Sequence, residues 1–318
     1  MTDIKLSSAI ADAMVHVTEV AAIAAFHEVG RGNEKQADQA AVDAMRTALN
    51  AVEMRGRIVI GEGERDEAPM LYIGEEVGTG SGPEIDIALD PLEGTTLTAK
   101  AMPNALAVLA IAPRGGLLHS PDVYMDKIAV GPGYEPGIVS IDATPAENIT
   151  AMAKAKGVDV RQMTACVLDR PRHAGIIESL RSVGARVALI TDGDVAGVIN
   201  TTDPSTGIDL YVGQGGAPEG VLAASALKCV GGQMQGRLHF RNDEERGRAD
   251  RVGITDLDRI YDLTELASAD TVFCATGVTT GDLLEGVRIE PGHASTETLV
   301  MSSFDNLVRR VRSRRPLS

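Results

Sequence analysis

The chain has 318 residues, a formal net charge of −15, 44% hydrophobic residues and only 3% aromatic residues. This length suffices for one large or two medium domains, and the hydrophobic content is ordinary for a globular protein. The acidic balance and the scarcity of aromatic side chains argue against nucleic-acid binding, which needs a cationic surface and stacking platforms.

Cysteine usage and the N-terminal sequence indicate the compartment. Cys166, Cys229 and Cys274 stand singly in apolar runs, which predicts buried, reduced thiols. The N-terminus lacks a basic region followed by an apolar signal core, and no run reaches the roughly 18 apolar residues of a membrane span. We therefore expect a cytoplasmic protein that does not bind a membrane.

The N-terminal part of the chain predicts helices followed by strands. Residues 6–29 form one helical pattern rich in Ala, Val and Ile, and Gly30 and Gly32 suit its end. A second helix is predicted over residues 34–54, with Asp38 near its start. A third helix is predicted over residues 68–77, and strands are predicted at 57–60, 85–89, 104–112 and 123–130.

Beyond this part the rhythm changes to alternating strands and helices. Residues 131–140 are rich in Gly and Pro, which predicts a domain boundary and two halves, 1–135 and 136–318. Strands are predicted at 163–168, 186–190, 208–212 and 271–275, and helices at 172–183, 195–200 and 219–229. Such alternation is typical of a mostly parallel sheet with helices on its faces. Arg309 to Arg315 are expected at the end of a final helix.

One turn carries the densest chemical signal. The sequence Asp90-Pro91-Leu92-Glu93-Gly94-Thr95-Thr96 follows the predicted strand 85–89. Open α/β folds place their sites at the carboxyl ends of strands, and oxygen ligands select hard cations such as Mg²⁺ or Mn²⁺. An Asx-type turn formed around Pro91 and Gly94 is the structural alternative.

A second strand also ends in glycine and carboxylates, at Gly61-Glu62-Gly63-Glu64. The recurrence favours a shared site that holds two cations, orients a phosphate and activates a water. A solvated acidic loop, or a carboxylate that interacts with a helix dipole, remains the alternative. The five candidate ligands lie in four separate turns: Asp38, Glu62, Asp90, Glu93 and Glu219.

Turns in the C-terminal half suit a phosphorylated sugar. The glycine-rich turn 213–219 leads into a helix, whose backbone N–H groups could hold a phosphate. Arg170 and Arg172 provide fork-shaped donors for a second phosphate, unless they form surface ion pairs, and Asp192 and Asp194 could accept from sugar hydroxyls. The Asp192-Gly193-Asp194 motif could also be an aspartyl-phosphate nucleophile with its acid partner, but its mid-chain position counts against this reading.

Taken together and in order, these motifs resemble the class II fructose-1,6-bisphosphatases of bacteria, a branch of the lithium-sensitive phosphatase superfamily. The likeness extends over nearly the whole chain. It rests on Gly30-Arg31-Gly32 with Asp38, on Pro171-Arg172-His173, and on residues 58–64, 66–70, 90–95, 104–108, 192–196, 215–220, 275–277 and 281–284.

The resemblance implies an α/β protein with a layered α-β-α-β-α sugar-phosphatase fold of two α/β halves. It implies hydrolysis of the 1-phosphate of fructose 1,6-bisphosphate, with Mn²⁺ or Mg²⁺ as cofactor. One cation would be bound by Asp38 and Glu62, and another by Asp90, Glu93 and Glu219. Thr95 would orient the attacking water, aided by Glu64. Substrate would be held by Glu93, Gly94, Thr95, Tyr124, Arg170, Pro171, Arg172, Asp192, Gly193, Asp194 and Gly216.

Two positions depart from the family pattern. Members carry Lys at the positions of Glu34 and Arg170, and here the first lysine is shifted to Lys35. The first change concerns the cation beside the reacting phosphate, and the second concerns the grip on the distal phosphate.

Other functions stay open at this point. The chain could act on sedoheptulose 1,7-bisphosphate or another phosphomonoester such as an inositol phosphate, or it could be a non-catalytic sugar-phosphate sensor. The resemblance also implies a homo-oligomer, a dimer or a tetramer.

Overall fold

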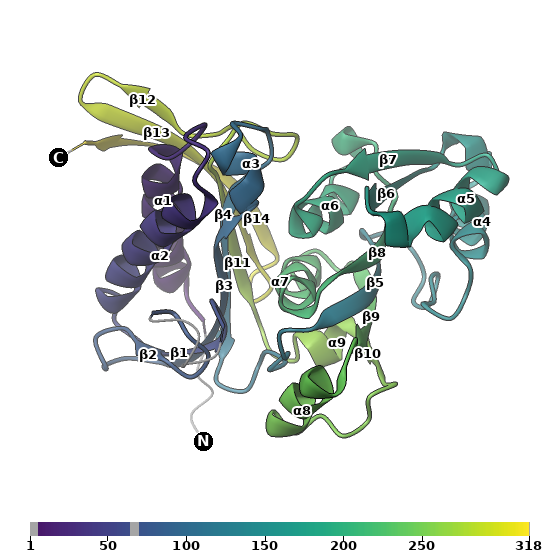
Figure 1. Cartoon of the computed structure of the whole chain (residues 1–318), viewed down its shortest axis with the longest axis horizontal. Helices are drawn as coiled ribbons and strands as arrows, with labels where there is room; N and C mark the ends of the chain where they lie inside the picture. The colour runs from purple at the N-terminus through teal and green to yellow at the C-terminus, as the bar shows by residue number, and fades with distance from the viewer. Residues whose placement is uncertain (1–5, 64–69, 318) are drawn as a thin grey trace. The chain divides into compact units, whose positions relative to one another are not determined.

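The computed structural model describes residues 6–63 and 70–317. The chain forms two compact units, one of residues 1–118 and 267–318 and the other of residues 119–266 (Figure 1). We call them the first and the second unit. These units differ from the predicted halves, because the strand at 124–130 pairs with strands of the second unit and the C-terminal strands return to pair with the first. Each unit combines a sheet with helices, which confirms the α/β class.

Two antiparallel helices open the first unit, α1 (Ser8–Phe26) and α2 (Glu34–Asn50). Each begins at a polar N-cap, Ser7 or Asn33, whose side chain accepts a backbone N–H of the first turn. Contrary to expectation, α1 is long and apolar enough by length and composition to cross a membrane. In the structure it is a core helix, since it packs on α2 and the sheet and its Thr18 hydroxyl accepts a hydrogen bond from Thr276.

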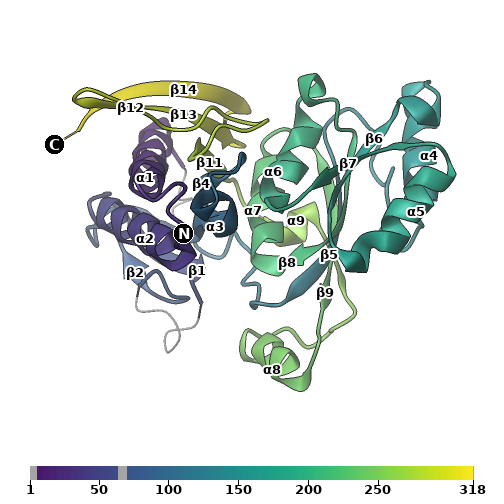
Figure 2. The same cartoon turned by 45° about the horizontal axis from the view of Figure 1, so that its top comes forward.

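The sheet of the first unit has eight strands in the order β12-β13-β11-β4-β3-β1-β2, with β14 paired to β13. Only β1 and β3 pair in parallel. Its core is built from Ala, Val, Ile, Leu and Met, with α1 and α2 on one face of the sheet (Figures 1 and 2). The elements are β1 (Arg55–Ile60), β2 (Glu76–Val77), β3 (Glu84–Glu93), α3 (Thr95–Ala99), β4 (Leu106–Pro113), β11 (Val272–Gly277), β12 (Arg288–Glu290), β13 (His293–Ser302) and β14 (Leu307–Pro316).

The helix predicted over residues 68–77 is wrong for its described part, residues 70–77. Leu71 has a left-handed φ of 52° and Gly74 one of 91°, neither of which an α-helix accommodates. The segment instead bonds to β1, because Gly74 N–H donates to Ile58 O, Ile58 N–H donates to Glu75 O, and the next residues form β2. Partners distant in sequence therefore override the local helical pattern.

The predicted C-terminal helix is also wrong, since residues 307–316 form β14, antiparallel to β13 along its whole length. The arginines of β14 meet carboxylates on neighbouring elements: Arg312 pairs with Glu297 and Arg315 with Glu19. These carboxylates belong to β13 and α1, so the strand is fixed by groups that the local sequence does not contain.

The second unit is a six-stranded sheet in the order β10-β9-β5-β8-β6-β7. Parallel pairing is confined to β6 with β7 and β8, so the prediction of a mostly parallel sheet is too strong. α4 and α5 cover one face and α6 and α7 the other (Figures 1 and 2). The strands are β5 (Tyr124–Val130), β6 (Thr164–Leu168), β7 (Arg186–Ile190), β8 (Leu210–Gly216), β9 (Gln233–His239) and β10 (Ile260–Asp262).

The helices of the second unit follow its strands closely. The short 3-10 helix η2 (Pro171–His173) begins three residues after β6, α6 begins four residues after β7, and α7 begins as β8 ends. Because β6, β7, β8 and β9 run in one direction, their carboxyl ends lie at one edge of the sheet, together with the start of the antiparallel β5. The helices are α4 (Pro145–Lys156), α5 (Ala174–Ser182), α6 (Asp194–Ile199), α7 (Ala217–Lys228), α8 (Asp243–Arg251) and α9 (Leu263–Leu266). All three cysteines of the chain are buried, as predicted.

Candidate active site

Three carboxylates of the first unit influence one another. Glu62 follows β1, and its pKa is raised from 4.5 to about 8 by burial, with the negative charges of Asp38 and Asp90 adding to the effect. Burial also raises the pKa of Asp38, in the second turn of α2. Partly buried carboxylates that repel one another favour a bound cation, and an all-oxygen donor set suits a hard divalent ion. The observed electrostatics therefore fit the metal predicted from the sequence.

The acidic sequence 90–93 places a further carboxylate, Glu93, beside Asp90. The sequence predicted that this strand ends at Leu89. In the structure β3 continues to Glu93, with a register shift between Asp90 and Glu93. Asp90 Oδ1 accepts the Leu92 N–H at 3.0 Å, so the Asx-type contact considered from sequence is present inside this irregularity. Carboxylate oxygens of Asp90 and Glu93 lie within 4.8 Å of one another, close enough to share an ion.

Gly94 turns the chain from β3 into α3. Its φ of 92° is left-handed, where other residues are strained, and Thr95 then opens the helix. The next hydroxyl, on Thr96, donates to Glu34 Oε1 at 3.0 Å. Glu34 is the residue found where the family pattern has Lys, so at this position the chain presents a carboxylate bonded to the turn, while Lys35 is exposed on α2.

We expect the stability of the metal-free protein to fall as the pH rises from about 5 to 8. The raised pKa of Glu62 means that the folded state keeps a proton which the unfolded chain releases near 4.5, so deprotonation favours unfolding until the pH passes about 8. Melting temperatures measured in chelator across this range should fall less steeply for Glu62→Gln than for the parent. The exposed Glu53→Gln serves as control, and an unchanged slope in Glu62→Gln would refute the assignment.

A buried ion pair organises the edge of the second unit. Lys127 of β5 donates to Asp194 at the start of α6, and also to Gly216 O of β8 at 2.7 Å. The side chains of Lys127 and Asp194 are 1% and 7% exposed. The lysine therefore ties the turn after β7 to the end of β8, which are both predicted substrate-binding segments.

Glycines at the end of β8 make room for carboxylates. A Cβ on Gly215 would lie 2.1 Å from Asp194 Oδ2, and one on Gly216 would lie 2.0 Å from Glu219 Oε2. Glu219 is in the first turn of α7, where the helix dipole favours a negative charge. The glycine-rich sequence therefore lets two acidic side chains approach the strand backbone.

His173 fixes the turn after β6. Its Nδ1 donates to Leu168 O at 2.7 Å, and its Nε2 accepts the Gln214 N–H at 2.9 Å. Burial lowers the pKa of His173, which keeps the ring neutral and suits one donor and one acceptor nitrogen. The imidazole thereby holds the Arg170-to-Arg172 turn against β8.

The arginines of this turn differ in their anchoring. Arg172 donates through Nη2 and Nε to Gln214 O, at 2.8 and 3.3 Å, and its guanidinium lies over the ring of Tyr124 at 5.0 Å. Arg170 reaches Asp192 only at 4.0 Å, with both side chains more than a third exposed. An exposed pair at that distance contributes little, so Arg170 stays available to a ligand.

The predicted residues thus form two groups, one in each unit. Within the first unit Asp38, Glu62, Asp90, Glu93 and Thr95 lie around the ends of β1 and β3. The predicted residues of the second unit lie at one sheet edge: Tyr124, residues 170–172 and 192–194, Gly216 and Glu219. Glu64 lies outside the described residues. Sequence reasoning assigned no role to Lys127 or His173, because single polar residues near apolar strands carry no local signal of their distant partners.

Comparison with known proteins decides the family. Residues 8–315 match the family model of the bacterial fructose-1,6-bisphosphatase, glpX-encoded. The chain belongs to the class II fructose-1,6-bisphosphatases. It is 47% identical over 321 residues to proteins of two Synechococcus strains, JA-3-3Ab and JA-2-3B'a(2-13), and 46% identical over 310 residues to one of Prochlorococcus marinus MIT 9303. In each case 93% of this chain and 92% of the relative are covered, and each relative is named D-fructose 1,6-bisphosphatase class 2/sedoheptulose 1,7-bisphosphatase.

Membership makes this protein a phosphatase of sugar-phosphate metabolism that requires a divalent metal. The acidic residues of the first unit match that requirement. The resemblance found in the sequence is therefore confirmed, including the reaction class.

Proposed function

We propose that this fructose-1,6-bisphosphatase cleaves the 1-phosphate of fructose 1,6-bisphosphate, giving fructose 6-phosphate and inorganic phosphate. The observation that carries the proposal is the match of residues 8–315 to this family in a chain that has every acidic residue of the expected set. A sensor without catalytic function has little need for such a set, so the enzymatic reading is favoured.

The metal ligands follow from the donor chemistry and the resemblance. Asp38 and Glu62 would hold one Mn²⁺ or Mg²⁺, and Asp90, Glu93 and Glu219 would hold another. When bound, divalent cations supply positive charge that polarises the phosphate and activates the attacking water. Their charge would also offset the burial, and the nearby negative charges of Asp38 and Asp90, that raise the pKa of Glu62.

The protein's own groups position the reactants. The Thr95 hydroxyl, at the first position of α3, orients the water, with Glu64 assigned to assist it. Asp192 and Asp194 accept from sugar hydroxyls, and the Gly216 backbone lets the substrate approach closely. Arg170 and Arg172 bind the distal phosphate, since a guanidinium fork matches phosphate geometry. The other residues that would hold the substrate are Glu93, Gly94, Tyr124, Pro171 and Gly193.

The second candidate substrate is sedoheptulose 1,7-bisphosphate, which the printed names of all three relatives include. Both substrates present a ketose 1-phosphate to the reacting groups and differ in the length of the chain that carries the distal phosphate. The distal subsite therefore sets the preference between them.

Phosphate release from both bisphosphates, each with Mn²⁺, with Mg²⁺ and with chelator, tests the function. We expect release that depends on metal and falls to background in chelator, and the ratio of kcat/KM values names the preferred substrate. Tight binding of either sugar without release under all metals would contradict the enzymatic assignment and revive the sensor.

Location and assembly are proposed on the resemblance alone. We propose that the enzyme works in the cytoplasm as a homo-oligomer, a dimer or a tetramer. Its substrate is a small phosphorylated sugar, and neither nucleic acid nor a membrane is expected as a partner.

A further inference from the structure

Arg241 lies near the sheet edge of the second unit whose turns are proposed to bind substrate, and no role has yet been assigned to it. β9 pairs with β5 so that Tyr124 lies opposite His239 on one side and opposite Gly216 of β8 on the other. Arg241 follows two residues after His239, the last residue of β9. The topology therefore brings Arg241 to the same edge as the turns proposed to bind substrate.

The ring of Tyr124 contacts the guanidinium groups of two arginines. Arg172 lies over its ring with Cζ 5.0 Å from the ring centroid, and Arg241 lies over the same ring at 4.6 Å. Each contact is within the range of a cation–π interaction. Glu245 offsets the charge of Arg241, whereas Arg172 donates to a carbonyl, so a positive charge beside this ring stays to attract an anion.

Each guanidinium group is held by a partner of its own, on β8 for Arg172 and on α8 for Arg241. Arg172 donates through Nε and Nη2 to Gln214 O, and Arg241 pairs through Nε and Nη2 with Glu245 Oε1. Within residues 6–63 and 70–317, Nη1 of neither arginine forms a hydrogen bond. Each arginine is thus fixed in position and keeps donors for a ligand.

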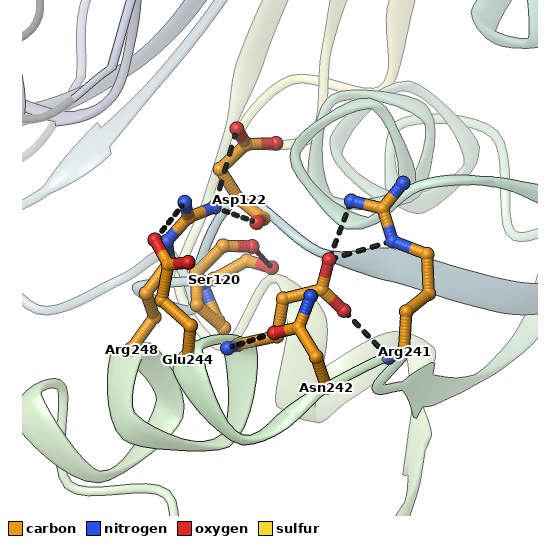
Figure 3. Close-up of polar contacts among 8 residues, drawn as sticks. Ser120, Asp122, Arg241, Asn242, Glu244 and Arg248 are labelled. Atoms are coloured by element: carbon orange, nitrogen blue, oxygen red, sulfur yellow. Dashed lines mark hydrogen bonds and ion pairs between the residues drawn. The ribbon is translucent and has the colours of Figure 1, made fainter.

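The anchor of Arg241 is itself fixed. Glu245 is 2% exposed and also accepts the Arg241 backbone N–H at 2.7 Å, while the Asn242 side chain caps α8. The Arg241 Nε donates to this carboxylate, and Figure 3 shows the guanidinium of Arg241 on the opposite side of the cluster from that of Arg248. Arg248 is occupied by Asp122 and Glu244, so Arg241 is the member of this cluster that reaches Tyr124.

We propose that Arg241 binds the phosphate of the substrate that is not cleaved, together with Arg172 across Tyr124. The inference rests on the proposed function and adds a residue to its distal subsite. A phosphate dianion would receive charge-assisted hydrogen bonds from two guanidinium groups that are already in place. The side chain of Arg241 is 55% exposed and held by its partner, so binding needs little reorganisation.

The test compares ligands that carry one phosphate or the other. In Arg241→Gln, we expect kcat/KM for fructose 1,6-bisphosphate to fall about 10- to 50-fold, mainly through KM. The inhibition constant of fructose 6-phosphate, which carries the distal phosphate alone, should rise by a similar factor. Competition by fructose 1-phosphate, which lacks it, should change by less than about threefold.

Two further variants separate binding from structure. Arg241→Lys keeps the charge and the pairing with Glu245 but not the fork, and it should recover part of the loss. Arg246→Gln, on the adjacent helix α8 and paired with the exposed Asp243, is the matched control and should behave as the parent.

The outcomes distinguish the two proposals. If Arg241→Gln weakens the binding of fructose 6-phosphate and fructose 1-phosphate equally, or of neither, the inference is wrong. Arg241 would then have only a structural role beside α8. If the parent enzyme releases no phosphate from either bisphosphate, the proposed function itself fails.

Discussion

Asp90→Asn is expected to lower kcat for phosphate release about 100- to 1,000-fold with either metal. The substitution removes one negative charge from the acidic cluster. The charge of Asp90 contributes to the raised pKa of Glu62, and a carboxylate oxygen of Glu93 lies close to one of Asp90. The amide oxygen can still accept the Leu92 N–H that Asp90 Oδ1 accepts at 3.0 Å, so the local backbone should be kept. The loss therefore reports on ion binding rather than on folding.

Calorimetric titration with Mn²⁺ should show a weakened or missing binding step in Asp90→Asn, at a melting temperature in chelator no lower than that of the parent, because a repelling charge is removed. Glu84→Gln is the matched control, because Glu84 begins the same strand and only makes an exposed ion pair with Arg55. Full metal-dependent turnover by Asp90→Asn would remove the assignment of this carboxylate to the metal.

The local sequence predicts most elements of the second unit, because apolar runs and the polar turns that end them can be recognised without knowing their partners. The apolar runs of β6 and β7 end at polar turns, and the helices after them begin within a few residues. Pairing direction is not a local property. β5 lies between β8 and β9 and runs antiparallel to both, and no residue of β5 specifies these partners by itself.

The same distinction explains the errors in the first unit. The helical pattern of residues 70–77 loses to hydrogen bonds with β1, and the arginine-rich C-terminus becomes a strand because β13 and α1 supply its partners. Neither set of partners is near in sequence. The continuation of β3 through Pro91 to Glu93 needs the same non-local information, since β4 supplies the pairing on either side of the irregularity.

The site shows what residue types can and cannot reveal. Carboxylates after apolar strands predicted the acidic group, because several acidic residues close together beside a core repel one another and favour a bound cation. Arg241 and Lys127 gave no comparable signal, since their role depends on Tyr124, Glu245 and Asp194, which only the fold brings near them.

Lys127→Met is expected to destabilise the protein by about 3–5 kcal/mol, because it leaves the buried Asp194 carboxylate without its partner. It should also lower kcat/KM, since Lys127 holds both Asp194 and the Gly216 carbonyl in the proposed substrate site. Urea unfolding followed by circular dichroism measures the first effect, and phosphate release measures the second. Lys156→Met is the control, because the Lys156 side chain that pairs with Asp209 is 53% exposed, and its loss should cost about 1 kcal/mol or less.

The double variant Lys127→Met/Asp194→Leu separates the two roles of this pair. An apolar pair of similar volume can replace a buried ion pair with little loss of stability, so the double variant should recover much of the unfolding free energy lost in Lys127→Met. It should not recover activity, because the carboxylate proposed to accept from the sugar hydroxyls is gone. Recovery of both would show that the pair only supports the fold, whereas a stable but inactive double variant would show that activity needs the Asp194 carboxylate itself.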